Sequence, residues 1–313
     1  MSLNIIDRVT GSLIGLACGD AVGTALEFMP RGSFEPVKDM VGGGPFNLLP
    51  GQWTDDTSMA LCLGHSLLYK NGFDPTDQMN RYCNWFHHGY MSSTGECFDI
   101  GSTVASALNK YLATEDPYSG AIDEFSSGNG SLMRLAPIAI FYHTDQIALI
   151  KYAGSSSRTT HGSAECIDAC RYFAALLAAA FSGAERSELI SSFYEPTTHK
   201  VKALSCGKFL NKPYESLSGS GYVIESLESA LWCFHKSRSY EEAVLMAANI
   251  GNDADTTAAI CGQIAGAFYG YLEIPESWKI KLHQQEQLYD MAVRLAHTGR
   301  SVCKAQYEQP AAD

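Results

Sequence analysis

Apolar residues recur at intervals of three and four residues along most of this 313-residue chain. The stripes run through Ile6, Val9, Leu13 and Leu16, through Met59, Leu63, Leu67 and Leu68, through Tyr172, Leu176, Leu177 and Ala180, and through Ile260, Ile264, Ala267 and Phe268. This spacing places apolar side chains on one face of an α-helix. Short alternating β-branched runs bounded by turns, which are typical of strands, are hard to find. The sequence therefore predicts an all-α fold.

The composition indicates a folded chain with a sizeable core. Hydrophobic residues make up 46% of it and charged residues 18%, a balance that excludes intrinsic disorder. No linker, low-complexity tract or internal repeat divides the chain, and residues 138–195 and 214–274 contain no proline, which suits long packed helices. We expect one compact domain over residues 1–313, with an ordered core of about residues 5–300.

Charge and cysteine content limit the partners and the compartment. With 22 Lys and Arg against 34 Asp and Glu, the net charge is −12, and no basic cluster offsets it, so we expect no nucleic-acid partner. The longest fully apolar run, Tyr172 to Phe181, is far below the roughly 20 residues that span a bilayer. No targeting signal and no Cys-x-x-Cys pair is present. We expect a cytoplasmic protein with reduced thiols and no membrane partner.

Three short segments, residues 51–59, 97–103 and 249–257, interrupt the helical pattern with acids, glycines and threonines. A good helix follows each one, so their carboxylates stand at helix N-termini. Helix capping explains one such acid per helix. Asp55 with Asp56, and Asp253 with Asp255, supply more carboxylates than one cap can use, and converging carboxylates repel one another unless a cation lies between them.

This spacing is typical of a site for a hard cation such as Mg²⁺, Mn²⁺ or Ca²⁺, which take oxygen ligands. No histidine lies close by, which argues against zinc, and an EF-hand loop starting at Asp253 would have Ala258 where its glycine belongs. The spacing favours metal binding over capping for Asp253 and Asp255. For Asp55 and Asp56 the spacing favours metal binding and helix capping equally, and for Asp99 it favours capping.

A glycine-rich segment, residues 126–134, leads into an apolar helix that we expect to begin near Leu132. Its Gly128-Asn129-Gly130 turn resembles loops that bind anions with backbone N–H groups, although an ordinary loop has the same pattern. His161 precedes the Ala-rich helix and Tyr222 stands at a helix start. Both positions are more often structural than functional.

Taken together and in order, these segments resemble the ADP-ribosylglycohydrolase family, and most closely its bacterial dinitrogenase-reductase-activating type. The resemblance extends from about Arg8 to Tyr271. It rests on Gly19-Asp20-Ala21-Val22-Gly23 with Glu27, on Trp53-Thr54-Asp55-Asp56-Thr57, on Phe98-Asp99-Ile100-Gly101, on Gly128-Asn129-Gly130-Ser131-Leu132-Met133-Arg134, and on Asp253-Ala254-Asp255-Thr256-Thr257-Ala258 followed by Gly262-Gln263-Ile264-Ala265-Gly266-Ala267.

The resemblance implies a single orthogonal helical domain with two divalent cations, Mg²⁺ or Mn²⁺, in a metal-lined cleft. By motif position, the metal ligands would be Glu27, Thr54, Asp55, Asp56, Asp253, Asp255 and Thr256. The catalytic residues would be Asp99, Asp55 and Glu27, with Asp99 as the base or the orienting group for the attacking water. The residues that bind ADP-ribose would be Gly128, Asn129, Gly130, Ser131, Met133, His161 and Tyr222.

The implied activity is hydrolysis of the bond between ribose C1″ of ADP-ribose and a side chain of a modified protein, with arginine as the favoured linkage. Two alternatives stay open. One is a silent ADP-ribose-binding or crystallin-like structural protein, and the other is a dinuclear-metal hydrolase that cleaves at phosphorus. The loops around residues 29–50 and 205–221 carry no side chain that singles out a guanidinium, and no pattern indicates an oligomeric state or an acceptor protein.

Overall fold

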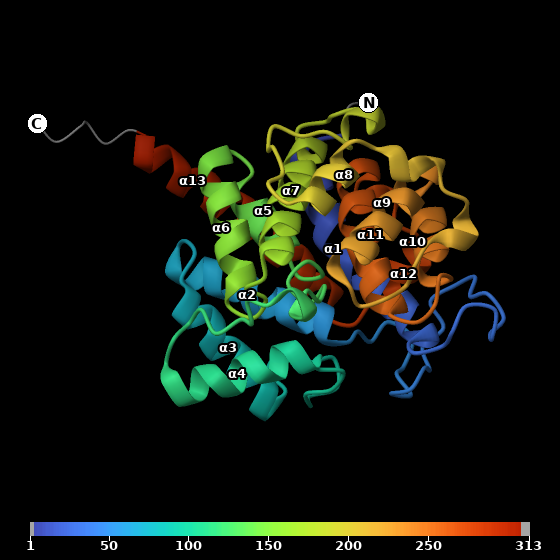
Figure 1. Ribbon diagram of the computed structural model, residues 1–313, viewed down its shortest axis with the longest axis horizontal. Coiled ribbons are helices and arrows are strands. Elements are labelled where there is room, and N and C mark those ends of the chain that lie inside the picture. Colours follow the sequence, from blue (N-terminus) through green and yellow to red (C-terminus); the bar gives the residue numbers. More distant parts are fainter. Residues whose placement is uncertain (1–2, 308–313) are drawn as a thin grey trace, which may run out of the picture.

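The computed structural model describes residues 3–307, so the expectations for the extreme ends of the chain lie outside the described residues. Within this part it contains thirteen α-helices and no strand, which confirms the all-α prediction (Figure 1). The helices are α1 (Ile5–Gly23), α2 (Asp55–Lys70), α3 (Pro75–His88), α4 (Ser102–Thr114), α5 (Ala136–Tyr142), α6 (Gln146–Arg158), α7 (Ala164–Phe181), α8 (His199–Ser205), α9 (Val223–Lys236), α10 (Tyr240–Ala248), α11 (Ala254–Tyr269), α12 (Glu276–Lys281) and α13 (Gln285–Tyr307).

Several helices begin at side chains that cap their own first turn. Asp74 precedes Pro75 and accepts a hydrogen bond from the Asp77 N–H at 2.9 Å. Asp145 and Ser163 do the same for α6 and α7. A capping oxygen satisfies a backbone donor that has no partner inside the helix, and proline fits the first helical position. These starts are therefore encoded locally.

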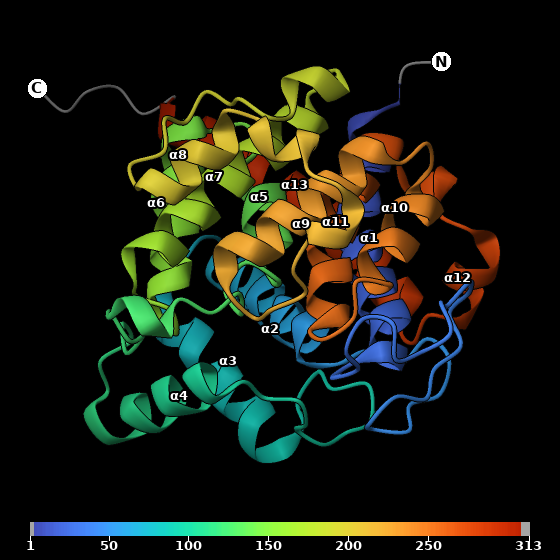
Figure 2. The same ribbon diagram turned by 45° about the vertical axis from the view of Figure 1, so that its right-hand side comes forward.

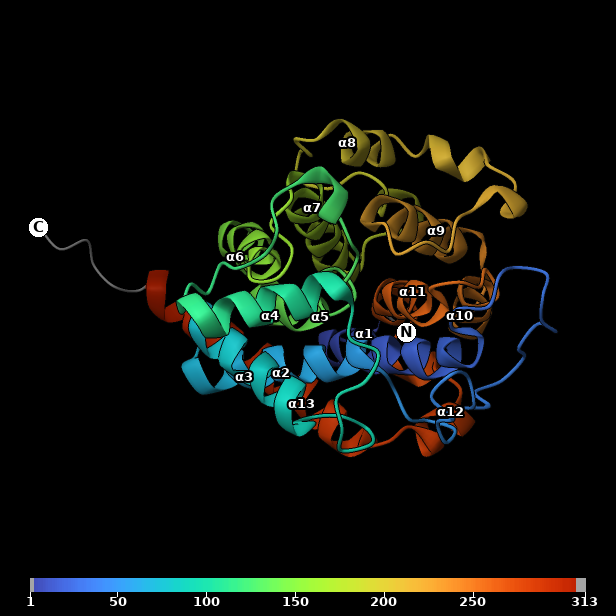
Figure 3. The ribbon, with the colours of Figure 1, turned by 60° about the horizontal axis from the view of Figure 1, so that its bottom comes forward.

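The central contact of the fold is an antiparallel pair of helices, α1 and α11, seen side by side in Figure 3. Four glycines spaced four residues apart on α1 face four small residues with the same spacing on α11. The facing pairs are Gly11 with Gly266, Gly15 with Gly262, Gly19 with Ala258 and Gly23 with Ala254. A Cβ atom at any of these glycines would overlap a backbone carbonyl of α11, so only glycine permits this close approach.

The remaining helices surround this pair. Helices α9 and α10 pack on α11, whereas α13 packs on α1 and α5. Helices α3 and α4 form the lower part of Figure 2, with α3 against α2. The C-terminal end of α1 therefore meets the N-terminal end of α11 near the start of α2, and these junctions carry the acids that the sequence analysis singled out.

One segment, Ile5–Leu26, is long and apolar enough to cross a membrane by length and composition alone. However, 94% of its most hydrophobic window is buried inside the protein, as expected for the central helix of a packed core. The apolar run at Tyr172 to Phe181 lies in α7, which is largely buried as predicted.

Candidate active site

A cavity of about 700 Å³ opens where the loops before α2, α4 and α11 meet. Its floor is acidic: Glu27, Asp55, Asp99, Asp253 and Asp255 all line it. A wall of the cavity contains Gly128, Asn129, Gly130, Met133 and His161. The volume is in the range of small-molecule sites, roughly 300–1,000 Å³.

The acids of the floor do not cap their own helices. No side-chain capping bond is made at the N-cap of α2, α4 or α11. Instead, Asp20 of α1 accepts hydrogen bonds from the N–H groups of Thr54 and Thr57, at 2.8 and 3.0 Å, and so caps α2. Glu27 accepts from the Ala254 N–H at 2.9 Å and so caps α11. Capping from a distant segment leaves the helices' own carboxylates free to face the cavity.

Carboxylate oxygens converge in two groups that share Asp255. One group is Asp20, Asp56 and Asp255, and the other is Glu27, Asp99 and Asp255; within each, one oxygen per residue lies within 4.8 Å of the others. The Thr54 hydroxyl adds an oxygen 3.2 Å from Asp56 Oδ2 and 3.1 Å from Asp255 Oδ2. Such a cluster of hard oxygen donors suits Mg²⁺ or Mn²⁺.

Nothing within the described protein neutralises this cluster. Among the ion pairs of the described side chains, none involves an acid of the floor. Asp56 is fully buried, and its Oδ1 has no hydrogen-bond partner. An unpaired buried carboxylate is costly. The donor set therefore fits bound divalent cations.

Burial and mutual repulsion raise the pKa values of these carboxyl groups. Burial, and next the neighbouring Asp255, raise the pKa of Asp20 and of Asp253 to about 7 and that of Asp99 to about 10. The same causes hold the pKa of Glu27 far above its ordinary range. Cations among these groups would favour the ionised forms and lower the pKa values again.

The predicted metal ligands differ in position. Asp55, Asp253 and Thr256 line the cavity, whereas Thr54 and Asp56 lie beneath its surface. The Thr256 hydroxyl lies 3.4 Å from Asp56 Oδ2. Asp253 also accepts a hydrogen bond from the Asn129 side chain at 2.7 Å, which ties the floor to the wall. All seven residues therefore lie in or directly under the floor.

Three cavity residues that are not glycine have a left-handed backbone: Phe28, Asp99 and Asn252, with φ of 62°, 59° and 60°. Two backbone hydrogen bonds join the loops of Glu27 and Asp253, from the Phe28 N–H to Asn252 and from the Asn252 N–H to Met29. Backbone strain of this kind is concentrated at functional sites.

The capping prediction for Asp99 is wrong, because α4 begins at Ser102 with Gly101 as its N-cap.

The glycine-rich wall is fixed by backbone pairing. The Asn129 N–H donates to Gly221 at 3.0 Å and the Val223 N–H donates to Ser127 at 3.0 Å. The predicted helix near Leu132 begins later, at Ala136, because residues 131–134 form a turn whose N–H groups at Leu132 and Met133 reach back to Asn129. This turn places Gly130 and Met133 at the cavity.

Two of the predicted ligand-binding residues lie outside the cavity lining. The Ser131 hydroxyl is buried and lies 2.9 Å from the Ser157 hydroxyl, with which it forms a hydrogen bond. The Tyr222 hydroxyl donates to Glu165 and accepts from Lys200. Both residues therefore support the wall through their own contacts.

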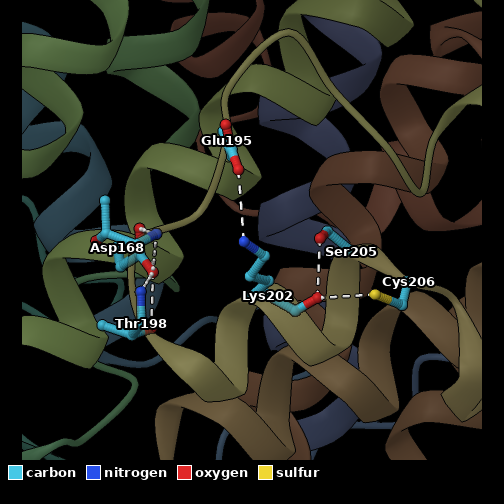
Figure 4. A network of polar contacts seen from close by, with 7 residues as sticks. Asp168, Glu195, Thr198, Lys202, Ser205 and Cys206 are labelled. Carbon is cyan, nitrogen blue, oxygen red and sulfur yellow. Dashed lines mark hydrogen bonds and ion pairs between the residues drawn. The ribbon is translucent and has the colours of Figure 1, made fainter.

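A buried carboxylate of α7 fixes the segment that precedes Lys200. Asp168 of α7 accepts hydrogen bonds from the Thr198 N–H and the Thr198 hydroxyl (Figure 4). It also accepts from the Thr197 N–H and from the Tyr194 hydroxyl. Burial would raise the pKa of Asp168, but these donors outweigh it and lower the pKa. This acid is thus saturated by the protein, unlike those of the floor.

Asp20 stands in the first of the sequence motifs, where its residue type alone indicated no role. Its four hydrogen bonds to Thr54 and Thr57 use both carboxylate oxygens. A signal was present: Asp20 lies seven residues before Glu27 in a helix that has no other acid after Asp7. An isolated acid in a buried helix needs partners.

Known proteins resemble this chain over nearly its full length. A family model described as ADP-ribosylglycohydrolase matches residues 1–305. A protein of Serratia proteamaculans named ADP-ribosylarginine hydrolase Tri1 is 41% identical over 93% of this chain and 79% of its own length. A Rhodospirillum rubrum protein named ADP-ribosyl-[dinitrogen reductase] glycohydrolase is 31% identical over 89% of this chain and 91% of its own.

The fold is also shared with a solved structure. A structure titled ADP-ribosylglycohydrolase-related protein complex superimposes with a TM-score of 0.84 at 41% identity, covering 95% of this chain and 99% of that one. Sequence, fold and family model agree on one assignment. This chain belongs to the ADP-ribosylglycohydrolase family.

Proposed function

We propose that this protein is a metal-dependent hydrolase that removes ADP-ribose from arginine side chains of modified proteins by cleavage at ribose C1″. The observation that carries the proposal is the convergence of buried carboxylates, without a basic partner, on the floor of a cavity large enough for a nucleotide. The relatives named as arginine-directed and dinitrogen-reductase-directed hydrolases support the same activity and the arginine linkage.

We infer that two divalent cations, Mg²⁺ or Mn²⁺, complete the floor. Their ligands would be drawn from Glu27, Thr54, Asp55, Asp56, Asp253, Asp255 and Thr256. When bound, the cations would supply Lewis-acid polarisation of the ribose hydroxyls and of a water molecule. Asp20 would act indirectly, by holding Thr54 and the start of α2 in place.

Within this site, Asp99 would take a proton from the attacking water or orient that water. It lines the cavity and belongs to the carboxylate group with Glu27 and Asp255. The water oxygen bonds to C1″, the C1″–N bond breaks with its electron pair leaving on the guanidine nitrogen, and one water proton passes to Asp99. The departing guanidine takes up a proton from solvent, and Asp99 returns its proton to solvent. Asp55 and Glu27 would stabilise the positive charge that develops at C1″.

The nucleotide part of the ligand would lie along the wall. Gly128, Asn129, Gly130, Met133 and His161 line the cavity there, and glycine lets a ligand approach the backbone closely. Ser131 and Tyr222 would hold this wall from behind.

The experiment is release of ADP-ribose from an arginine-ADP-ribosylated protein with Mg²⁺ or Mn²⁺, and again with EDTA. We expect metal-dependent release of intact ADP-ribose. Release of AMP would show that the scissile bond is a phosphoester. Tight binding of ADP-ribose without release from arginine, serine or O-acetyl conjugates would identify a binding or structural protein.

The role of Asp99 has its own test. We expect Asp99→Asn to lower the release rate at least about a hundredfold, since it removes the group that accepts the proton. The cations should still bind, which metal titration measures. Near-normal turnover of this variant with metal bound would rule out Asp99 as the base.

We also infer that the whole chain acts as one domain in the cytoplasm. A single hydrophobic cluster includes residues from α1 to α13. All ten cysteines are free and eight of them are buried, which suits a reducing compartment.

A further inference from the structure

Arg134 is a fully buried cation behind the glycine wall. Among the described side chains it makes no ion pair; its guanidinium lies 4.7 Å from the centre of the Tyr82 ring. One Nη1–H donates to the Gly130 carbonyl at 2.9 Å, and one Nη2–H donates to the Thr160 hydroxyl at 2.7 Å. A guanidinium can only donate, so each partner must act as the acceptor.

This forces the direction of the next hydrogen bond. The Thr160 hydroxyl has one proton, and its other neighbour is Nδ1 of His161 at 2.8 Å. Arg134 has no acceptor to offer, so among the described partners of this hydroxyl only Nδ1 can receive its proton. A proton on Nδ1 would leave the Thr160 proton without an acceptor in this buried site. The network therefore leaves Nδ1 bare and places the ring proton on Nε2.

The Nε2 edge of His161 faces the cavity. The ring lines the cavity, and Nε2 makes no hydrogen bond to the described residues. A Cβ atom built on Gly128 would lie 3.3 Å from Nε2, and one built on Gly130 would lie 2.8 Å from Cε1. The two glycines thus keep the space before the ring clear, and a donor without a protein partner faces that space.

The charge of the ring is set by the same surroundings. Burial, and next the charge of Arg134, lower the pKa of His161 to about 3. The ring is therefore neutral near pH 7. A neutral ring in this tautomer offers a donor to any ligand oxygen, whereas the other tautomer would present a lone pair that only a ligand hydroxyl could meet.

We propose that Arg134 and Thr160 are positioning residues that hold His161 as its Nε2–H tautomer, so that the ring donates a hydrogen bond to an oxygen of bound ADP-ribose. The choice of ADP-ribose as the ligand rests on the proposed function. The direction of the Arg134–Thr160–His161 chain rests on the contacts alone. Neither Arg134 nor Thr160 touches the ligand in this arrangement, because both lie behind the ring.

The test uses Thr160→Val, which keeps the shape of the side chain and removes its hydroxyl. We expect binding of ADP-ribose, measured by calorimetry with Mg²⁺ present, to weaken about tenfold. Nitrogen-15 NMR of the His161 ring should show the proton on Nε2 in the wild type and a mixture of tautomers in the variant. Thr160→Ser, which restores the hydroxyl, should bring both measurements back.

Thr159→Val is the matched control. Thr159 is equally buried and adjacent, but its hydroxyl contacts Ser156 and Gln78 and does not contact His161. We expect this variant to bind ADP-ribose within about twofold of the wild type, although it removes a buried hydrogen bond of similar strength. Unfolding temperatures of both variants show whether a loss of binding follows from a loss of structure.

Several outcomes would overturn the inference. A proton on Nδ1 in the wild-type protein rejects the tautomer, and this measurement needs no variant. Unchanged binding in a folded Thr160→Val protein, or an equal loss in Thr159→Val, rejects the positioning role. A wild-type protein that binds ADP-ribose but releases none from arginine rejects the proposed function and leaves this inference intact. A wild-type protein that fails to bind ADP-ribose rejects the ligand named here.

Discussion

The acidic floor and the glycine wall face the same cavity but are built on opposite principles. The floor gathers carboxylates that the described protein leaves without a cation, and one buried oxygen of Asp56 has no partner. In the wall, backbone pairs fix the loop, and Arg134 sets the donor direction of its neighbours. Under the proposed function, ions from solution would complete the floor, whereas the contacts of the wall are made without any ligand.

Asp255→Asn should disrupt the carboxylate cluster of the floor most strongly without altering the wall, since Asp255 belongs to both carboxylate groups. We expect kcat/KM for ADP-ribose release to fall on the order of a thousandfold. The unfolding temperature in EDTA should rise, because one of the repelling charges is removed. A variant that keeps its activity, or that is less stable than the wild type in EDTA, would contradict a cation site here.

Gly130→Ala should disturb the packing of the wall against His161 without altering the floor. The new Cβ would lie 2.8 Å from His161 Cε1 and 3.2 Å from Nε2, so the ring or the loop must move. We expect KM for the arginine-linked substrate to rise roughly tenfold to a hundredfold, with metal affinity unchanged. Gly128→Ala should have a smaller effect, because its Cβ would lie 3.3 Å from Nε2. Equal loss of metal binding in Gly130→Ala would show that the two regions are not separable.

The two regions should also respond differently to pH. In EDTA, the folded protein binds more protons than the unfolded chain above about pH 4, because the pKa values of Asp20 and Asp253 are raised to about 7 and that of Asp99 to about 10. Stability is therefore lost as pH rises through these values, and the unfolding temperature should fall by more than about 10 °C from pH 5 to pH 9.

The contribution of His161 to stability changes with pH in the opposite direction, and it stops changing at a lower pH. Its pKa is lowered to about 3, so its contribution grows as pH rises from 3 to about 6.5 and is constant above that. Saturating Mn²⁺ should remove the decline of stability above pH 7, because cations compete with protons for the floor. A calorimetric series with Mn²⁺ and with EDTA measures both trends. A decline that persists in Mn²⁺ would place its origin outside the floor.

The smallest effect is expected at the rim, from Phe28→Gly. Phe28 is 64% exposed at the cavity and has a left-handed backbone, which glycine adopts without strain. The variant should fold at least as well as the wild type but show a KM a few times higher for arginine-linked ADP-ribose, since an exposed ring can stack on a guanidinium. An unchanged KM would remove Phe28 from substrate binding.

Much of the fold could be predicted from the sequence because it is encoded locally. Apolar spacing marks the helices, and the acid-rich interruptions at Asp55, Asp99 and Asp253 mark the starts of three of them. The family resemblance gathered these distant segments into one site. Local reasoning then failed where a partner comes from afar, because Asp20 caps α2 and Glu27 caps α11. It also failed for Asp99, because Gly101 is the N-cap of α4.

The close approach of α1 and α11 was visible in the sequence as glycines at every fourth position, Gly11 to Gly23. Large apolar residues dominate a periodicity analysis, so this stripe of small residues gave no signal there. Ser131 and Tyr222 show a different limit of sequence-based prediction. A matching motif position identifies the right segment, but which way a hydroxyl turns depends on neighbours such as Ser157 and Glu165.

The glycine contact between α1 and α11 has a consequence for how the protein is made. Glu27 and the α11 backbone that it caps are 227 residues apart along the chain. During synthesis the first helix leaves the ribosome long before its partner exists, and no local contact can substitute for it. The floor can therefore form only after Asp255 and Thr256 have been translated. Until then, Asp20 and Glu27 remain ordinary acids on a nascent chain, and cation binding should mark the final stage of folding.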